Sequence, residues 1–187
     1  MIKANKKNER FWVSQKCLMP YGQPHDLLKY SENEIKIEMN KRGCLFARWV
    51  SEFDVPEVTQ WWYCIRDEKI SLENLNSKQR YRVKRGLKFC RVERVDPHQY
   101  GEGLYNVLVE SMKDYPPEYR GSIETYETFS KGFDVAHADW FAVFDAESNG
   151  IIGYSTCHRG DEMAHLTALK VMPEHLNKDV NAALVLK

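Results

Sequence analysis

The sequence predicts an α+β fold, in which a mixed, mostly antiparallel sheet is flanked by helices in three layers. Three strand-like segments follow one another late in the chain, at residues 140–145, 151–158 and 163–171, and the last of them alternates between apolar and polar residues. Asn149-Gly150 and Gly160-Asp161 separate them, and both pairs are typical of tight hairpin turns. Helical spacing of apolar residues precedes this run at 97–115 and follows it at 176–186. We therefore expect a three-strand antiparallel meander packed against helices.

Composition places the chain among ordinary soluble globular proteins. Its 187 residues are enough for one sizeable core, and 27 basic residues balance 27 acidic ones, so no overall field favours nucleic acid or an anionic membrane. The five cysteines are scattered without a C-x-x-C pair, which favours reduced thiols and argues against a zinc site. The polar N-terminus does not resemble a signal peptide, and no segment approaches the roughly 18 apolar residues of a membrane span. We expect a cytoplasmic protein.

The first part of the chain, residues 1–87, is interpreted as an N-terminal region of aromatic strands followed by a basic helix. Phe11–Val13 reads as a short strand, and residues 45–50 and 61–65 are aromatic and β-branched runs that also favour strands. From Ser71 the spacing becomes helical, with Ser71 as the expected N-cap and Gly86 as the expected stop.

The second part, residues 88–187, is expected to form the main domain. A strand at 88–95 precedes the helix at 97–115, which begins with Pro97 and ends before Pro116. Residues 122–131 are predicted to form a second helix, with Ser122 as its cap. The meander and the final helix then complete the order strand, two helices, three strands, helix.

A basic cluster extends from Lys78 to Arg94, where eight basic residues accompany the single acidic residue Glu93. Such a cluster could bind the phosphates of a nucleotide, an RNA or a lipid pyrophosphate. The alternative is a charged helix face that is only solvated. We keep RNA as a predicted partner of residues 78–94.

The last quarter of the chain carries a family resemblance. A strand at 163–171, then Met172-Pro173-Glu174, then the small-residue helix of 179–185 resembles the acyl-donor motif of the GNAT acyltransferase superfamily. Residues 75–86 are similar to the basic-helix passage of the Fem-type aminoacyltransferases, a branch of that fold. Asp179 and Asn181 occupy positions where the family's phosphate-binding loop usually has glycine.

The resemblance implies an acyl or aminoacyl transfer to an amine acceptor. The donor would be acyl-coenzyme A or aminoacyl-tRNA, and the acceptor an amine-bearing small molecule or a molecule like a peptidoglycan precursor. The strand end and the following loop would bind the donor through Leu169, Lys170, Val171, Lys178, Asp179, Val180 and Asn181. Because Asp179 adds negative charge at this loop, we expect Asp179→Gly to strengthen coenzyme A binding.

Amine acylation often needs a base, and His165 is the best candidate because its ordinary pKa lies near neutrality. In a regular strand His165, Thr167, Leu169 and Val171 share one face. His158 and Glu162 are weaker candidates. Cys157 and His158 are adjacent on a strand and therefore point to opposite faces, which excludes a nucleophile–base pair. The six histidines show no metal-ligand spacing.

Two further expectations concern the whole protein. The substituted glycine positions are compatible with an inactive binding or scaffold protein that keeps the fold. The apolar pattern also continues to Leu186 without a stop signal, so we expect the domain to be incomplete at the C-terminus. An uncovered strand edge would then favour self-association into a homo-oligomer.

Overall fold

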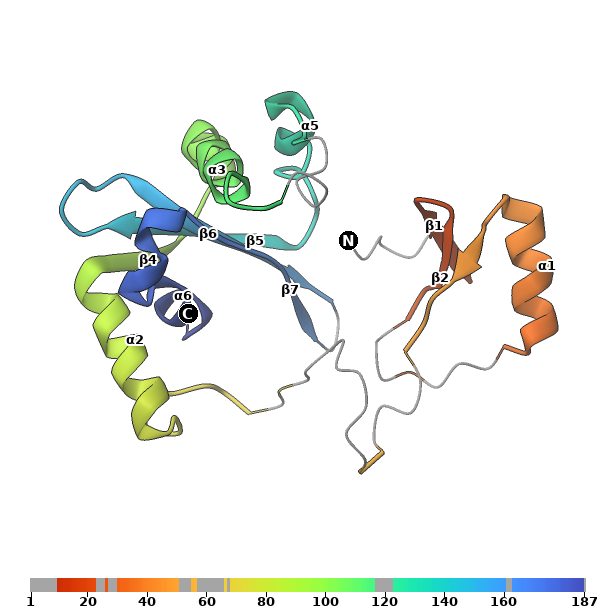
Figure 1. Cartoon of the computed structure of the whole chain (residues 1–187), viewed down its shortest axis with the longest axis horizontal. Helices are drawn as coiled ribbons and strands as arrows, with labels where there is room; N and C mark the ends of the chain where they lie inside the picture. The colour runs from red at the N-terminus through yellow and green to blue at the C-terminus, as the bar shows by residue number, and fades with distance from the viewer. Residues whose placement is uncertain are drawn as a thin grey trace. The chain divides into compact units, whose positions relative to one another are not determined.

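The computed structural model describes residues 10–22, 26, 30–50, 55–56, 66, 68–116, 123–160 and 163–186. The chain forms two compact units, Met1–Asp67 and Glu68–Lys187 (Figure 1). Each unit combines a sheet with helical structure, which confirms the predicted α+β class. The second unit begins at Glu68, so it includes the basic helix that the sequence analysis grouped with residues 1–87. Within the described residues, no helix combines the length and the apolar character needed to cross a membrane.

The first unit is a small three-stranded sheet with one helix. Its elements are β1 (Phe11–Ser14), β2 (Cys17–Pro20), α1 (Glu32–Arg42) and β3 (Phe46–Ala47). β1 and β2 are antiparallel, and β2 pairs with β3 in parallel. Gln15 and Lys16 join β1 to β2 with positive φ at both residues, as a mirror-image hairpin turn requires. The core of the unit contains Phe11, Leu18, Ile35 and Cys44.

The predicted strand at 11–13 is confirmed as β1. The strand predicted at 45–50 is shorter than expected, because only Phe46–Ala47 pair with β2. The run at 61–65 lies outside the described residues.

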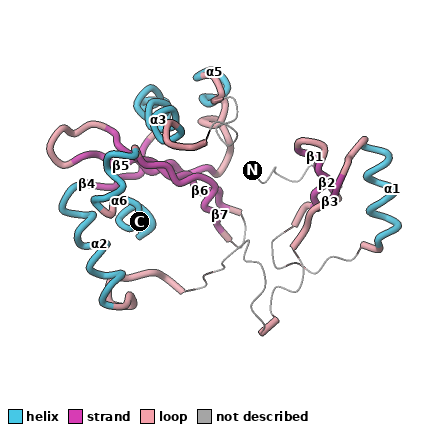
Figure 2. The backbone as a smooth tube through the Cα atoms, in the orientation of Figure 1, coloured by secondary structure: helices cyan, strands magenta, loops and turns pink. Residues whose placement is uncertain are grey.

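The second unit is built on a four-stranded antiparallel sheet of order β4-β5-β6-β7 (Figure 2). Its strands are β4 (Cys90–Val95), β5 (Ala138–Asp145), β6 (Ile151–Arg159) and β7 (Ala164–Val171). The predicted meander is therefore confirmed, with Asn149 at positive φ in the β5–β6 turn. The strand predicted at 88–95 is confirmed for Cys90–Val95, which form β4, whereas residues 88 and 89 belong to the preceding helix.

Helices cover both faces of this sheet (Figure 1). On one face, α3 (Pro97–Met112) and α5 (Tyr126–Ser130) bury Leu104, Val107 and Phe129 against β5 and β6. On the other face, α6 (Val180–Leu186) buries Val180, Ala183 and Leu184 against β4, β5 and the end of β7. α2 (Ser77–Phe89) packs along α6. The short 3₁₀ helix η1 (Pro173–Lys178) connects β7 to α6.

The boundaries of α2 differ from the prediction. Asn76 is the N-cap: its side chain accepts from the backbone N–H of Gln79, and the Gln79 side chain accepts in return from the N–H of Asn76. The predicted cap, Ser71, instead begins a turn that Arg80 holds by donating to backbone carbonyls. The expected stop at Gly86 is also wrong, because the helix continues to Phe89 with Gly86 buried in its interior.

The second predicted helix is shorter than expected. α5 begins after Thr125, whose side chain accepts from the N–H of Thr128, and the proposed cap Ser122 lies outside the described residues. The helix predicted at 97–115 is confirmed as α3, with Pro97 in its first turn and Asp96 as its cap.

Candidate functional site

β7 lies at one edge of the sheet and, among the described residues, pairs only with β6. The backbone N–H of Met172 donates to the carbonyl of Ile152, which fixes the alternation of the β6–β7 ladder. In an antiparallel pair, alternate residues direct their N–H and C=O groups away from the partner strand. Leu169 and Val171 are those residues here. Their backbone groups therefore point away from β6. Leu169 is 37% exposed and could pair there with an extended ligand, whereas Val171 is only 5% exposed.

A β-bulge interrupts β7 at Thr167. Thr156 pairs with Ala168 while Cys157 pairs with Leu166, so Thr167 is the extra residue. The hydroxyls of Thr156 and Thr167 lie 2.8 Å apart, and the Thr167 hydroxyl donates to the Thr156 carbonyl. Alternation is thereby shifted by one residue.

The bulge corrects the prediction that His165 shares a face with Leu169 and Val171. Val171 belongs to the core beneath α6. Lys170 points to the other face, where its Nζ lies 3.5 Å from the Met112 sulfur of α3. His165, beyond the bulge, lies on the same face as Lys170, and its cross-strand neighbour is His158.

The candidate base His165 is partly buried near the start of β7. Burial lowers the pKa of the neighbouring His158, which favours its neutral form. Six residues separate His165 from Val171, a distance of about 20 Å along a strand. The structure therefore does not bring His165 together with the η1–α6 turn, and only a ligand lying along β7 would reach both. Glu162 lies outside the described residues.

The connection from β7 to α6 carries the other predicted binding residues. Asp179 links η1 to α6 in the left-handed conformation, with φ of 58°. Val180 is fully buried and exposes no surface to a ligand. Lys178 lies over the Phe89 ring at 5.6 Å, and Asn181 is partly buried in the first turn of α6.

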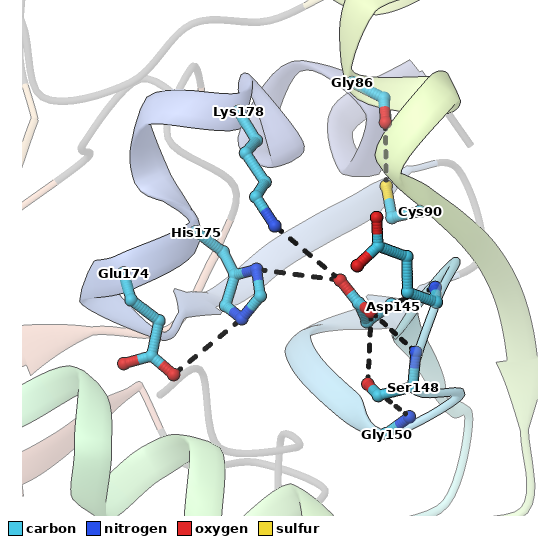
Figure 3. Close-up of polar contacts among 9 residues, drawn as sticks. Gly86, Cys90, Asp145, Ser148, Gly150, Glu174, His175 and Lys178 are labelled. Atoms are coloured by element: carbon cyan, nitrogen blue, oxygen red, sulfur yellow. Dashed lines mark hydrogen bonds and ion pairs between the residues drawn. The ribbon is translucent and has the colours of Figure 1, made fainter.

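Asp145, at the end of β5, anchors one side of this connection (Figure 3). Its Oδ1 accepts from the backbone N–H groups of Glu147 and Ser148, at 3.0 and 2.9 Å. Its Oδ2 lies 3.8 Å from His175 Nδ1 and 3.9 Å from Lys178 Nζ. The Ser148 N–H contributes most to lowering the pKa of Asp145, so this buried carboxylate stays charged beside the two η1 side chains.

Asp179 anchors the other side, against α2. Its Oδ1 accepts from Arg82 Nε and its Oδ2 from Arg85 Nη1, both at 2.8 Å. The hydrogen bond from Arg82, followed by that from Arg85, lowers the pKa of Asp179. Gly86 allows the close approach: a Cβ there would lie 2.5 Å from the carbonyl oxygen of Asp179. The turn is therefore fixed directly against α2.

No family model and no curated protein matches this sequence. Among solved structures, the PaiA N-acetyltransferase from Thermoplasma acidophilum in complex with coenzyme A is 21% identical, with a TM-score of 0.44 over 52% of this chain and 67% of that one. A Desulfovibrio desulfuricans structure described as a GNAT-family acetyltransferase is 20% identical, with a TM-score of 0.38 over 51% of this chain and 60% of that one. At such TM-scores these likenesses do not assign the chain to a family.

Several contacts at this site were not predicted from the sequence. The role of Asp145 had a local signal, because an aspartate before Glu147–Gly150 is typical of a turn held by its side chain. Arg82 and Arg85 were noted only as members of the basic cluster. No local pattern indicated that they bind Asp179, since their contact joins α2 to a turn far along the chain.

The remaining arginines of the basic cluster also have internal partners. Arg80 donates to the carbonyl of Leu72, Arg91 pairs with Glu93, and Arg94 pairs with Asp139. The lysines of the cluster, Lys78, Lys84 and Lys88, are exposed. Among the described residues, no group of three or more His, Cys, Asp or Glu side chains is arranged to hold a metal ion.

Proposed function

We propose that the second unit transfers an acyl or aminoacyl group to an amine acceptor, with the acyl-bearing arm of the donor lying along the open edge of β7. The observation that carries the proposal is the outward-facing backbone of Leu169 and Val171 on a strand that pairs only with β6 among the described residues. The resemblance of residues 163–185 to an acyl-donor motif supports it, as does the order of strand, two helices, meander and helix.

His165 is proposed as the base. The acceptor amine would attack the donor carbonyl carbon, forming a C–N bond as the bond to the thiol or hydroxyl leaving group breaks. An ammonium cannot attack, so a proton must first leave the acceptor nitrogen, and a neutral His165 imidazole can accept it. His165 belongs to β7, the strand along which we place the donor, and it lies on the sheet face that carries α3.

The finer parts of this proposal follow the resemblance. The donor is acyl-coenzyme A or aminoacyl-tRNA, and the acceptor is an amine-bearing small molecule or a molecule like a peptidoglycan precursor. RNA contact through residues 78–94 would depend on Lys78, Lys84 and Lys88, because the arginines of the cluster have internal partners. Cytoplasmic location and self-association remain predictions.

A specific observation favours a second candidate, a binding or scaffold protein without transfer activity. The carboxylate of Asp179 engages one nitrogen of Arg82 and one of Arg85 and cancels part of the positive charge that would attract a phosphate-bearing donor. On this alternative, β7 still offers its open edge, and the occupant is an extended peptide segment that pairs with the strand.

The test is a substitution at the edge of β7. Leu169→Pro removes the outward N–H, and proline is tolerated on an edge strand when its missing N–H does not serve the ladder. We expect this variant to fold and to lose transfer from acetyl-coenzyme A and from aminoacyl-tRNA. Leu169→Ala keeps the N–H and is the matched control. Full activity of a folded Leu169→Pro variant would contradict the proposed edge.

A second substitution tests the base. His165→Gln should lower kcat about 10²- to 10⁴-fold and remove the ascending limb of the pH–rate profile, with little change in KM. The control is His98→Gln, because His98 lies on α3 and pairs with Asp134. If the unchanged protein transfers from neither donor but a peptide pairs with β7, the scaffold alternative is correct.

A further inference from the structure

The site at Asp179 is a carboxylate held between two guanidinium groups. Arg82 and Arg85 stand three residues apart on α2, and each donates to a different oxygen of Asp179 at 2.8 Å. Arg85 also donates to the carbonyl of Asn177 at 2.8 Å. The Asp179 side chain is only 12% exposed, whereas those of Arg82 and Arg85 are 57% and 39% exposed. The two arginines therefore already bind an anion that the chain itself supplies.

This arrangement bears on phosphate recognition. Paired arginines are a common means of binding a phosphate, because their donors match its oxygens and their charge opposes its own. Here the Asp179 carboxylate already engages one nitrogen of each guanidinium and cancels part of their charge. A diphosphate that bound these two guanidinium groups would lie next to the Asp179 carboxylate, whose oxygens are 2.8 Å from a nitrogen of each arginine, and like charge would oppose its binding.

The turn also has little freedom to move Asp179 aside. Gly86 of α2 lies so close to the Asp179 backbone that a Cβ would contact its carbonyl oxygen at 2.5 Å. The amide groups of Ala182 and Ala183 donate to that same carbonyl. On the other side, Asp145 lies 3.9 Å from Lys178, the residue before Asp179. Contacts of the Asp179 backbone therefore fix the position of the carboxylate, in addition to the hydrogen bonds from Arg82 and Arg85.

We propose that Asp179 determines donor specificity by excluding a diphosphate from the turn between η1 and α6. The residues present do not fit the diphosphate of coenzyme A at this turn. This inference rests on the proposed function and narrows it: an acyl donor that lies along β7 must be one whose binding requires no diphosphate contact at Asp179. Arg82 and Arg85 then serve to position the turn rather than to hold the donor.

The experiment measures binding of inorganic pyrophosphate, and separately of coenzyme A, by isothermal titration calorimetry on the full chain. The main variant is Asp179→Asn, which keeps the shape of the side chain and removes its charge. We expect it to bind pyrophosphate at least tenfold more tightly than the unchanged protein. The affinity should fall with added salt, and it should fall back when Arg82→Ala and Arg85→Ala are added to Asp179→Asn.

The matched control is Glu110→Gln, which makes the same change in charge and removes a partner from Lys113 on α3. It should leave pyrophosphate binding unchanged, which separates a local effect from a change in overall charge. Asp179→Gly is the second variant in case Asp179→Asn fails to fold, because glycine readily adopts the φ of 58° at this position.

Three results would overturn the inference. The first is an affinity of the unchanged protein for pyrophosphate that lies within threefold of the affinity of the Asp179→Asn variant. The second is the absence of pyrophosphate binding by both Asp179 variants. The third is binding by Asp179→Asn that survives loss of both arginines. An acyl-transfer assay with several donors is read separately. Failure of all transfer refutes the proposed function, while the pyrophosphate titration alone decides the role of Asp179.

Discussion

Gly86→Ala is the sharpest test of how α2 holds the β7–α6 connection. A Cβ on residue 86 would lie 2.5 Å from the carbonyl oxygen of Asp179 and 3.1 Å from the Cβ of Ala183. Overpacking of this kind costs about 1–3 kcal/mol. The contact is with backbone, which cannot rotate away, so we take the upper end of that range. Alanine is favoured over glycine inside a helix by about 1 kcal/mol. The net loss of unfolding free energy is therefore about 2 kcal/mol.

The control for this measurement is Gly103→Ala in α3. A Cβ there would lie 2.8 Å from Cδ1 of Ile151, the flexible end of a side chain that can turn aside. We expect Gly103→Ala to be neutral or to stabilise by up to about 1 kcal/mol. Urea unfolding gives both free energies, and the Tm of Gly86→Ala should fall by about 8 °C, at about 4 °C for each kcal/mol in a unit of this size. If Gly86→Ala is as stable as Gly103→Ala, the turn is not packed against α2 as described.

Two further predictions concern the anchors of the same unit. Asn76→Ala should lower the unfolding free energy by about 1 kcal/mol, because it removes the N-cap of α2. Ser71→Ala should change the unfolding free energy by less than about 0.5 kcal/mol. Equal effects of the two substitutions in urea unfolding would mean that Ser71 also caps the helix. Asp145→Asn should destabilise the protein at neutral pH. The pKa of Asp145 is lowered in the folded state, so its contribution is complete above the usual value near 3.8 and is lost as pH falls through the lower, folded value. The stability difference between the two proteins should therefore shrink in acid, and a constant difference across an acid titration would refute this role.

The sheet of the second unit could be predicted because its signals are local. Asn149 takes a positive φ in the β5–β6 turn, and β5 and β6 contain runs of consecutive buried residues, as expected for strands covered on both faces. The bulge at Thr167 could not be predicted in this way. It arises from the register between β6 and β7, including the contact between Thr156 and Thr167, and a single strand sequence does not contain that register.

The start of α2 was mispredicted although a local signal was present. Asn76 and Gln79 stand three residues apart, as the two side chains of a capping box do, immediately before the helical spacing. Leu72 and Leu75 extended the apolar spacing toward the N-terminus, which favoured Ser71 as the N-cap instead of Asn76. In the structure these two residues lie in the turn that Arg80 holds through its hydrogen bonds to their carbonyls. A tertiary contact thus replaced helical hydrogen bonds that the spacing alone had favoured.

Asp179 shows why the candidate site could be located from the sequence while its electrostatics could not. The position of Asp179 along the chain placed it in the turn after β7. From the sequence alone, its negative charge indicated only repulsion of an anionic donor. Its partners, Arg82 and Arg85, are 97 and 94 residues away, and only the packing of α2 on α6 brings them to 2.8 Å. The same carboxylate that repels a phosphate also cancels part of the positive charge of the two arginines that would attract one. Removing its charge therefore does more than relieve repulsion: it exposes two oriented guanidinium groups. For this reason Asp179→Asn should gain affinity for pyrophosphate only while both arginines remain.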